Sequence, residues 1–388
     1  MVKREVRKSV PLVAAAVSLV AVAALLATAC TTEDESTENG EASASTSAPA
    51  RDAPAESPPP DCTEPQSCTT RQLADAADVI FGTAVTSERL DEPDFSATLV
   101  DTFNSVTPEW ELKWDAVQPS PDEWDFGPVD EIVEFAEAND LQVKGHALIW
   151  EQDLIDSTPE WVLQIDDPDE LRQVITDHIT TVMDRYEDSI DRWDVVNEPL
   201  ETLGDELYDN HFRQVLGDGY VAEMFAIAEA AAPGESLWLN EAAVEFQPAK
   251  AAALVALTRD LVDAGVPIDG VGIQGHLVGG TVDAVALEQL VAELEALGVE
   301  VAITELDVPA RDEVDPLGVQ AETYRDALDA CFAQRCRDVT LWGFTDRYTW
   351  IDGTFGEGLA PLPFDVDYRP KPALDAIRER LASVGASS

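Results

Sequence analysis

The chain has 388 residues, of which 77 are acidic and 24 are basic, so its formal net charge is −53. An acid excess of this size excludes electrostatic binding to nucleic acid or to an anionic surface. It also makes the folded chain repel itself, although at about 1 M salt the Debye length falls to about 3 Å and screens this repulsion. We therefore expect a salt-adapted protein, with an ordinary acidic secreted protein as the alternative.

Residues 1–30 have the pattern of an export signal. Four basic side chains within the first eight residues precede an apolar run over 10–26, which ends in Ala27-Thr28-Ala29-Cys30. This pattern predicts a secretory signal peptide. The cysteine after small residues indicates a bacterial lipoprotein that is lipidated on Cys30, although a lipobox usually has Leu where Ala27 stands. An ordinary secretion signal and an uncleaved anchor helix are the alternatives. All three place the rest of the chain outside the cytoplasm, and only the N-terminus would contact a membrane.

Residues 31–70 are rich in Ser, Thr, Glu, Ala and Pro, so we expect a disordered acidic linker. The five cysteines are an odd number, which fits one lipidated residue and four paired ones. Close spacing in an exported chain predicts two short-loop disulfides, Cys62–Cys68 and Cys331–Cys336. Metal binding is the alternative for these cysteines, but no histidine lies near either pair. We expect no metal site.

Residues 71–388 alternate between strand-like and helix-like segments. The expected strands are 79–85, 103–107, 142–150, 192–197, 237–240, 270–275, 300–305 and 339–344. The helical segments, in which apolar residues recur at spacings of three and four, include 129–138, 171–186, 219–231, 249–264, 284–297 and 321–331. Eight strands that are each followed by a helix predict an α/β fold, a (β/α)8 TIM barrel with a single catalytic domain. An open doubly wound sheet is the alternative, but the glycine-rich loop typical of that fold is missing after the first strand.

Two of the expected strands end in a glutamate. Glu198 follows the run Trp193-Asp194-Val195-Val196-Asn197, and Glu305 follows Val301-Ala302-Ile303-Thr304. In such a barrel the carboxyl ends of the strands form the active site, so both side chains should reach its mouth. Two facing carboxyl groups are what cleavage of a glycosidic bond requires. We predict a retaining glycoside hydrolase with Glu305 as nucleophile and Glu198 as acid/base, with carboxyl groups about 5–5.5 Å apart.

Other residues at the strand ends fit this chemistry. A pair formed by His276 and Asp307 is expected to orient the imidazole against Glu305 and keep that carboxylate ionised. Asn197 can donate a hydrogen bond to the sugar 2-hydroxyl, a contact that strengthens in the transition state. Sugar faces can stack on the side chains of Trp150, Trp342 and Trp350.

At these residues the chain resembles glycoside hydrolase family 10, the retaining endo-β-1,4-xylanases, over nearly all of 71–388. The ordered motifs that carry the resemblance are Phe81-Gly82-Thr83-Ala84-Val85, Phe103-Asn104-Ser105-Val106-Thr107-Pro108-Glu109, Gly145-His146, Trp193 to Glu198, Gly272-Ile273-Gln274-Gly275-His276-Leu277, Ile303-Thr304-Glu305-Leu306-Asp307, Leu341-Trp342-Gly343, Tyr348-Thr349-Trp350, Phe364-Asp365 and Tyr368-Arg369-Pro370-Lys371-Pro372.

The resemblance implies the same roles for Glu198 and Glu305. It implies contacts with the sugar on the non-reducing side of the cut from Lys113, His146, Trp150, Asn197, Gln274, His276 and Trp342. Glu109 matches a residue that binds the next sugar out. The implied partner is xylan or a related β-glycan, with no cofactor and no nucleic acid, and we expect a monomer.

The chain departs from the family at three sugar-binding positions. Trp110 stands where the family usually has Asn, Asp153 where it often has Gln, and Ala242 where it usually has Tyr. Trp110 can either stack on a sugar or block the second sugar of xylan. The alternative function is therefore the same retaining mechanism on another β-linked polysaccharide or a plant glycoside. A carbohydrate-binding lipoprotein without catalysis, or a barrel lyase or metal-dependent hydrolase, are remoter alternatives.

Overall fold

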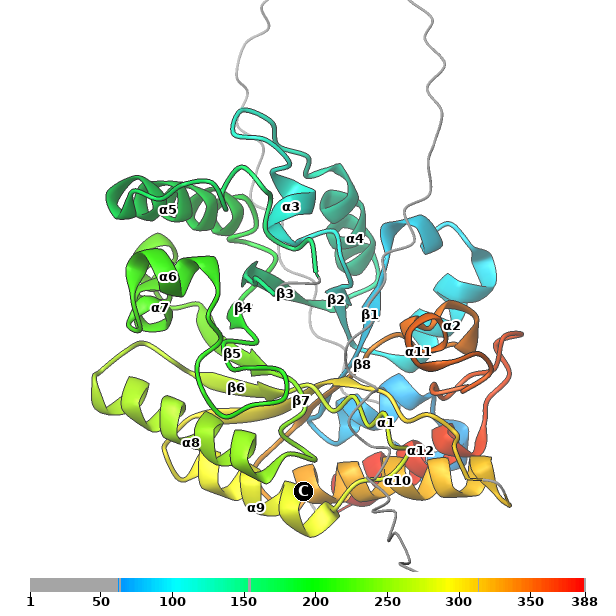
Figure 1. The fold of residues 1–388 in the computed structure, drawn as a ribbon. Helices are drawn as coiled ribbons and strands as arrows, with labels where there is room; N and C mark the ends of the chain where they lie inside the picture. Colours follow the sequence, from blue (N-terminus) through cyan, green and yellow to red (C-terminus); the bar gives the residue numbers. More distant parts are fainter. Residues whose placement is uncertain (1–61, 63, 153–154, 313, 387–388) are drawn as a thin grey trace, which may run out of the picture.

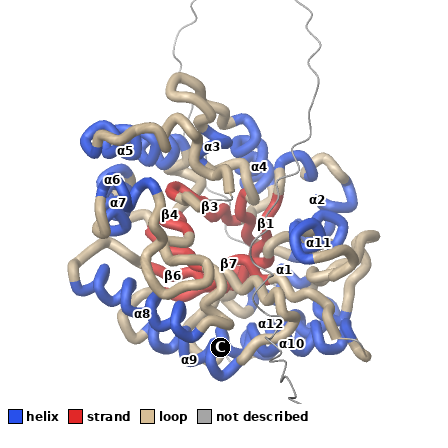
Figure 2. Tube along the Cα trace, in the orientation of Figure 1, coloured by secondary structure: helices blue, strands red, loops and turns tan. Residues whose placement is uncertain are grey.

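The computed structural model describes residues 62, 64–152, 155–312 and 314–386. Cys30 and Asp153 lie outside the described residues, as do the expected signal peptide and most of the expected linker. Within the described residues, eight parallel strands pair in chain order and close into a barrel, with the last strand beside the first. The predicted TIM barrel is confirmed, and helices surround the strands (Figures 1 and 2).

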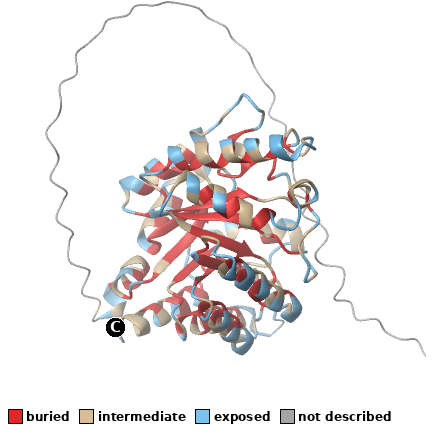
Figure 3. Cartoon of the chain, turned by 90° about the vertical axis from the view of Figure 1, so that its left-hand side faces the viewer, coloured by how far each residue is buried: buried red, intermediate tan, exposed pale blue. Residues whose placement is uncertain are grey.

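The strands of the barrel are short and almost wholly buried. Their bounds are β1 Ile80–Val85, β2 Ser105–Pro108, β3 Gln142–Ile149, β4 Arg192–Asn197, β5 Ser236–Glu241, β6 Gly270–Ile273, β7 Glu300–Leu306 and β8 Asp338–Leu341. All six residues of β4 are buried, as expected for a parallel strand that is covered on both faces. Figure 3 shows this burial along the strands, while exposure concentrates on the outer helices.

The outer layer is built from amphipathic helices. The bounds of the longer ones are α1 Thr70–Ala76, α2 Pro93–Thr102, α4 Gly127–Ala138, α5 Pro168–Arg185, α7 Tyr220–Ala231, α8 Pro248–Asp263, α9 Ala284–Glu295, α10 Pro316–Phe332 and α12 Pro372–Gly385. Shorter helices lie in the loops, α3 Trp114–Val117, α6 His211–Leu216 and α11 Trp350–Phe355. Many of them begin with Pro in the first turn, where its missing N–H costs nothing.

Large aromatic side chains in the barrel wall require glycine on the neighbouring strand. A Cβ atom on Gly145 of β3 would lie 2.2 Å from the ring of Trp193 on β4. The Gly-His sequence at residues 145 and 146 therefore does two things. It makes room for Trp193, and it places His146 at the pairing position of Asp194.

Both predicted disulfides, Cys62–Cys68 and Cys331–Cys336, are formed. The first lies beside α12, because Arg378 donates a hydrogen bond to the carbonyl oxygen of Cys68. No group of residues in the described ranges has the arrangement of a metal site. Among the helices that the structure describes, none combines the length and apolarity needed to cross a bilayer.

Candidate active site

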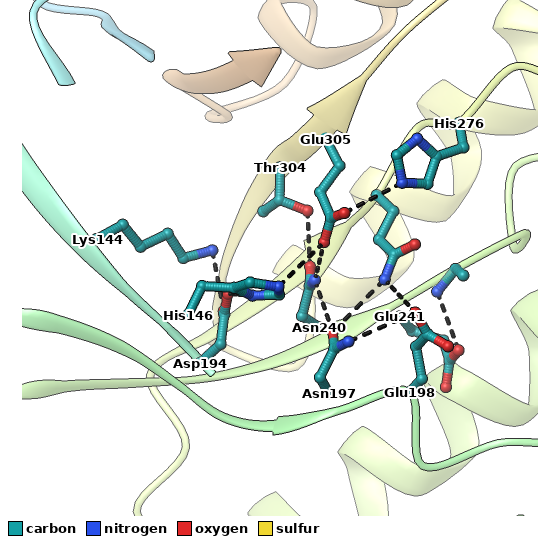
Figure 4. A network of polar contacts seen from close by, with 12 residues as sticks. Lys144, His146, Asp194, Asn197, Glu198, Asn240, Glu241, His276, Thr304 and Glu305 are labelled. Carbon is teal, nitrogen blue, oxygen red and sulfur yellow. Dashed lines mark hydrogen bonds and ion pairs between the residues drawn. The ribbon is translucent and has the colours of Figure 1, made fainter. Parts of the chain in front are cut away.

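Glu305 lies near the end of β7, and both of its carboxylate oxygens accept hydrogen bonds. Asn240 Nδ2 lies 2.6 Å from Glu305 Oε1, and His276 Nε2 lies 3.1 Å from Glu305 Oε2. The other ring nitrogen of His276 lies 2.9 Å from Asp307 Oδ2, which also accepts a hydrogen bond from the indole N–H of Trp350 at 2.8 Å. The expected pairing of His276 with Asp307 is present. It fixes the imidazole, whose contact with Glu305 is shown in Figure 4.

Glu198 follows β4 directly, in a left-handed backbone conformation with φ of 52°. Its Oε1 accepts a hydrogen bond from Gln274 Nε2 at 2.8 Å and a longer one from Asn197 Nδ2 at 3.4 Å. Asn197 Oδ1 in turn accepts from Asn240 Nδ2 at 2.9 Å. One connected set of amide side chains therefore joins the two glutamates across the mouth of the barrel (Figure 4).

The environments of the two glutamates move their pKa values in opposite directions. Burial raises the pKa of Glu198, and the hydrogen bond from Gln274 offsets only part of this effect. Burial alone would also raise the pKa of Glu305, but the hydrogen bond from His276 and the nearby charges of His276 and Lys113 lower it below its ordinary value. Two carboxyl groups with diverging pKa values can act as an acid and a nucleophile at the same pH.

The two histidines at the rim differ in charge for physical reasons. Burial lowers the pKa of His276, but the carboxylates of Asp307 and Glu305 outweigh it and raise that pKa well above 6.5. Burial and the charge of Lys113 lower the pKa of His146. His276 is therefore an imidazolium that donates at both nitrogens, whereas His146 is neutral at pH 7.

His146 is held by a buried ion pair beneath it. Its Nδ1 lies 2.8 Å from Asp194 Oδ2, and Lys144 Nζ lies 2.9 Å from Asp194 Oδ1. Because the ionised carboxylate needs a donor, the neutral imidazole carries its proton on Nδ1 and leaves Nε2 as an acceptor. That Nε2 lies 3.9 Å from Glu305 Oε1, so it can accept a hydrogen bond from a hydroxyl group that lies beside this carboxylate.

Lys113 provides a buried cation at the same mouth. Its ammonium lies 5.2 Å from the ring centre of Trp150 and 5.6 Å from that of Trp342. Within the described part of the chain its Nζ has no hydrogen-bond acceptor, and burial lowers its pKa to about 8. Burial, with the charge of Glu111 second, raises the pKa of Glu109 to about 7. Both groups lie close enough to Glu305 for its charge to affect their pKa values.

Two tryptophan rings lie close to the rings of His146 and His276, and the strand that precedes both tryptophans ends earlier than expected. The rings of His146 and Trp342 are 5.2 Å apart, and those of His276 and Trp350 are 4.8 Å apart. Strand β8 was expected to run to Phe344 but ends at Leu341, because Gly343 turns the chain with φ of 83°. Trp342 thus follows the strand directly, and Trp350 begins α11 in the loop beyond it.

Two features of the site had no role in the sequence analysis. Asn240 is fully buried on β5, accepts a hydrogen bond from Thr304 Oγ1 at 2.6 Å, and donates to Glu305. Glu241 and Lys250 form a fully buried ion pair at 2.8 Å behind Glu198. The position of Asn240 near the end of a strand is the sequence feature that could have identified it as a site residue. No local sequence pattern identifies Lys250 as a site residue, because it lies within helix α8.

The structure describes two of the three positions at which the chain departs from the usual family residues, Trp110 and Ala242. They lie on opposite sides of this network. Trp110 is 42% exposed, and its ring lies 6.5 Å from that of Trp150. It lines, with Glu109, a cavity of about 650 Å³ between the loops that follow β1, β2 and β8. Ala242, on the other side, presents no side chain beyond Cβ.

Comparison with known proteins agrees with this geometry. Residues 69–380 match the family model of glycosyl hydrolase family 10. The chain is 35% identical over 308 residues to endo-1,4-beta-xylanase C of Phanerodontia chrysosporium, covering 78% of this chain and 76% of that protein. It is 36% identical over 304 residues to an endo-1,4-beta-xylanase of Agaricus bisporus, covering 76% of this chain and 89% of that protein.

Solved structures give the same result. Xylanase 10B of Thermotoga maritima superimposes with a TM-score of 0.77 at 31% identity, covering 82% of this chain and all of that one. Xylanase 10B of Thermotoga petrophila, solved in complex with xylobiose, superimposes with a TM-score of 0.76 at 31% identity, over 82% of this chain and 98% of that one. The expected resemblance is confirmed, and the chain belongs to glycosyl hydrolase family 10.

Proposed function

We propose that this glycosidase is a retaining endo-β-1,4-xylanase that works outside the cell. The observation that carries the proposal is that the pKa values of the two carboxyl groups are shifted in opposite directions. Glu305 is held ionised by His276 and Asn240, while burial keeps Glu198 protonated to a higher pH. A retaining glycosidase needs this pair, one group to attack and one to donate a proton.

In the first step, Glu305 attacks the anomeric carbon while Glu198 donates its proton to the leaving glycosidic oxygen. This forms a covalent glycosyl–enzyme ester and releases the shortened chain. In the second step, Glu198, now a carboxylate, takes a proton from water as the water attacks the same carbon. Glu305 leaves as a carboxylate, and the product keeps the β configuration.

The surrounding groups supply the sugar contacts. In this proposal, Lys113 and the acceptor nitrogen of His146 bind hydroxyl groups of the sugar, and the amide of Asn197 donates to the 2-hydroxyl. Gln274 orients Glu198, and Trp150, Trp342 and Trp350 offer aromatic surfaces. We assign Glu109 to the sugar one position farther from the cleaved bond. Its carboxyl group lies close enough to Lys113 to interact with the charge of that ammonium group.

The location of the enzyme is part of the proposal. Two disulfides favour an oxidising compartment, because cytosolic thiols are kept reduced. The export pattern of residues 1–30 and the position of Cys30 support a bacterial lipoprotein, with 31–70 between the anchor and a monomeric catalytic domain over 71–388. The described end of this stretch is ordered rather than disordered, because the Cys62–Cys68 disulfide lies there and α1 begins at Thr70.

Trp110 favours a second candidate function, the same mechanism on a different β-linked glycan. Its side chain stands at the wall of the cavity beside Glu109, where a second sugar would lie. A bulky indole there can exclude a xylan-type sugar or stack on a different one. Replacing Trp110 by Asn should then raise activity on xylan relative to other β-glycans.

The proposed function is tested by product analysis on xylan, β-glucan and an aryl β-xylobioside. We expect wild-type enzyme to degrade xylan into oligosaccharides and to release the aryl group, and Glu305→Ala to do neither. Activity on β-glucan without activity on xylan would favour the second candidate. Release by Glu305→Ala equal to that of wild type would refute the assignment of the nucleophile.

A further inference from the structure

The groups proposed to hold the attacked sugar come mainly from one half of the barrel mouth. Lys113 follows β2, His146 and Trp150 belong to β3 and its end, and Trp342 follows β8. In the closed order of strands, β8, β1, β2 and β3 are contiguous, so β4, β5, β6 and β7 form the opposite half. We expect the part of the substrate that leaves to extend over this opposite half, which includes the loops that follow β4 and β5.

The loop between β5 and α8 changes character along its length. Ala242 and Ala243 present only methyl groups next to the site, and the following residues, Val244 and Glu245, are buried. Phe246 then stands outward and is 47% exposed. Among the described residues, it and Trp110 are the strongly exposed large aromatic side chains, and Trp110 lies at the other end of the mouth.

Hydrogen bonds fix this loop beside the acid/base. Gln247 Nε2 donates to the carbonyl oxygen of Thr202 at 3.0 Å, which joins the β5 loop to the β4 loop. Thr202 Oγ1 donates to Gln152 Oε1 at 3.2 Å, and Gln152 Nε2 donates to the carbonyl oxygen of Glu198 at 3.3 Å. The position of Phe246 is thus tied, through three side chains, to the backbone of Glu198.

The exposed aromatic ring suits a sugar rather than a charged ligand. A pyranose presents an apolar face of C–H groups that can cover an aromatic ring, which removes apolar surface of both from water. Leu203, next to Thr202 on the joined β4 loop, is also large, apolar and 57% exposed. An apolar surface fixed in place loses little conformational freedom on binding, so it retains more of the binding free energy.

We propose that Phe246 is a sugar-binding platform for the leaving portion of the substrate. It takes a neutral pyranose beyond the one joined to the cleaved bond, with Leu203 as the second contact. The platform compensates for the small side chains at Ala242 and Ala243, which cannot hold the nearer sugar. This inference rests on the proposed glycosidase function and adds that the substrate is a chain gripped on its leaving side.

The test compares a long and a short substrate. Linear β-1,4-xylohexaose can reach Phe246, whereas the aryl group of an aryl β-xylobioside ends next to the cut. We expect Phe246→Ala to lower kcat/KM on xylohexaose about tenfold, the factor that partial burial of one aromatic side chain supports. On the aryl xylobioside it should stay within about twofold of wild type, which also shows that the variant folds.

Two further variants sharpen the result. Phe246→Tyr keeps an aromatic face and should retain activity on xylohexaose. Val285→Ala removes a side chain on α9 that is 65% exposed, and it should leave kcat/KM on both substrates unchanged. Equal losses on both substrates, or no loss on xylohexaose, would overturn the inference while the proposed function stands. A wild-type protein that cleaves neither substrate would instead refute the proposed function, and the platform with it.

Discussion

His276 Nε2 lies 3.1 Å from Glu305 Oε2, and the imidazole is itself charged because Asp307 supports it from behind. This contact places a full positive charge against the proposed nucleophile. It explains how a buried carboxylate stays ionised, since burial alone would raise its pKa.

Replacing His276 by Asn should move the acid limb of the pH profile of kcat/KM to higher pH. The variant loses the charge that lowers the pKa of Glu305, so this carboxylate becomes protonated, and inactive as a nucleophile, at a higher pH. The measurement is kcat/KM on an aryl xylobioside across the acid range. His211→Asn in α6, outside the network, is the control. An unmoved acid limb in His276→Asn would contradict the electrostatic role.

Replacing Glu245 by Gln should stabilise the protein above neutral pH. Burial raises the pKa of Glu245 to about 7, and no other described residue donates a hydrogen bond to its carboxylate. In the unfolded chain the ordinary value is 4.5, so the folded state binds the proton more tightly and is destabilised as pH rises from 4.5 to about 7. The full penalty, about 3 kcal/mol, is present only above that window.

The check is urea unfolding of wild type and variant at about pH 4 and about pH 8. We expect the variant to gain free energy of unfolding at the higher pH and little at the lower one. Glu131→Gln, on the exposed face of α4, removes the same charge from an acidic protein and controls for general repulsion. A gain in that control as large as in Glu245→Gln would refute the local explanation.

Replacing Ala243 by Gly should stabilise the loop after β5. Ala243 has φ of 63°, a left-handed conformation that costs a non-glycine residue about 1–2 kcal/mol. Glycine removes this strain but gives the unfolded chain more freedom, so we expect a net gain of up to about 1 kcal/mol. Ala242, whose φ is not positive, should lose about 0.5–1 kcal/mol on the same change. Equal effects at both positions in denaturant unfolding would contradict this account.

The charge of −53 predicts stabilisation by salt. The melting temperature should rise between about 0.05 M and about 2 M NaCl, because screening shortens the range of repulsion between acidic side chains. Differential scanning calorimetry provides the measurement. A melting temperature that stays flat or falls with salt would show that repulsion does not limit the stability of this chain.

The sequence predicted the parts of this fold that depend on local pattern. Strand β4 has the expected bounds, because an apolar run that is buried on both faces is unambiguous. Helices α2 and α12 were not among the predicted segments, although their buried residues have helical spacing. Helix α2 begins at Pro93, between two of the motif segments, and helix α12 begins at Pro372, where the last motif segment ends.

The site was predicted only as a set of strand ends. Glu198, Glu305, His276 and Asp307 lie together because parallel strands deliver their carboxyl ends to one rim. The contact of Asn240 with Glu305 spans 65 residues and depends on how the barrel closes, which no local pattern encodes. For the same reason, Lys250 gave no signal as the buried partner of Glu241.

The central claim, that Glu305 attacks and Glu198 serves as acid/base, is tested most directly by the stereochemistry of the first product. Proton NMR, recorded as wild-type enzyme cleaves a β-linked xylo-oligosaccharide, resolves the anomer released before mutarotation. Two successive displacements at one carbon predict that the β anomer appears first. Initial release of the α anomer would contradict the account, because it requires direct attack by water and leaves Glu305 without its proposed role.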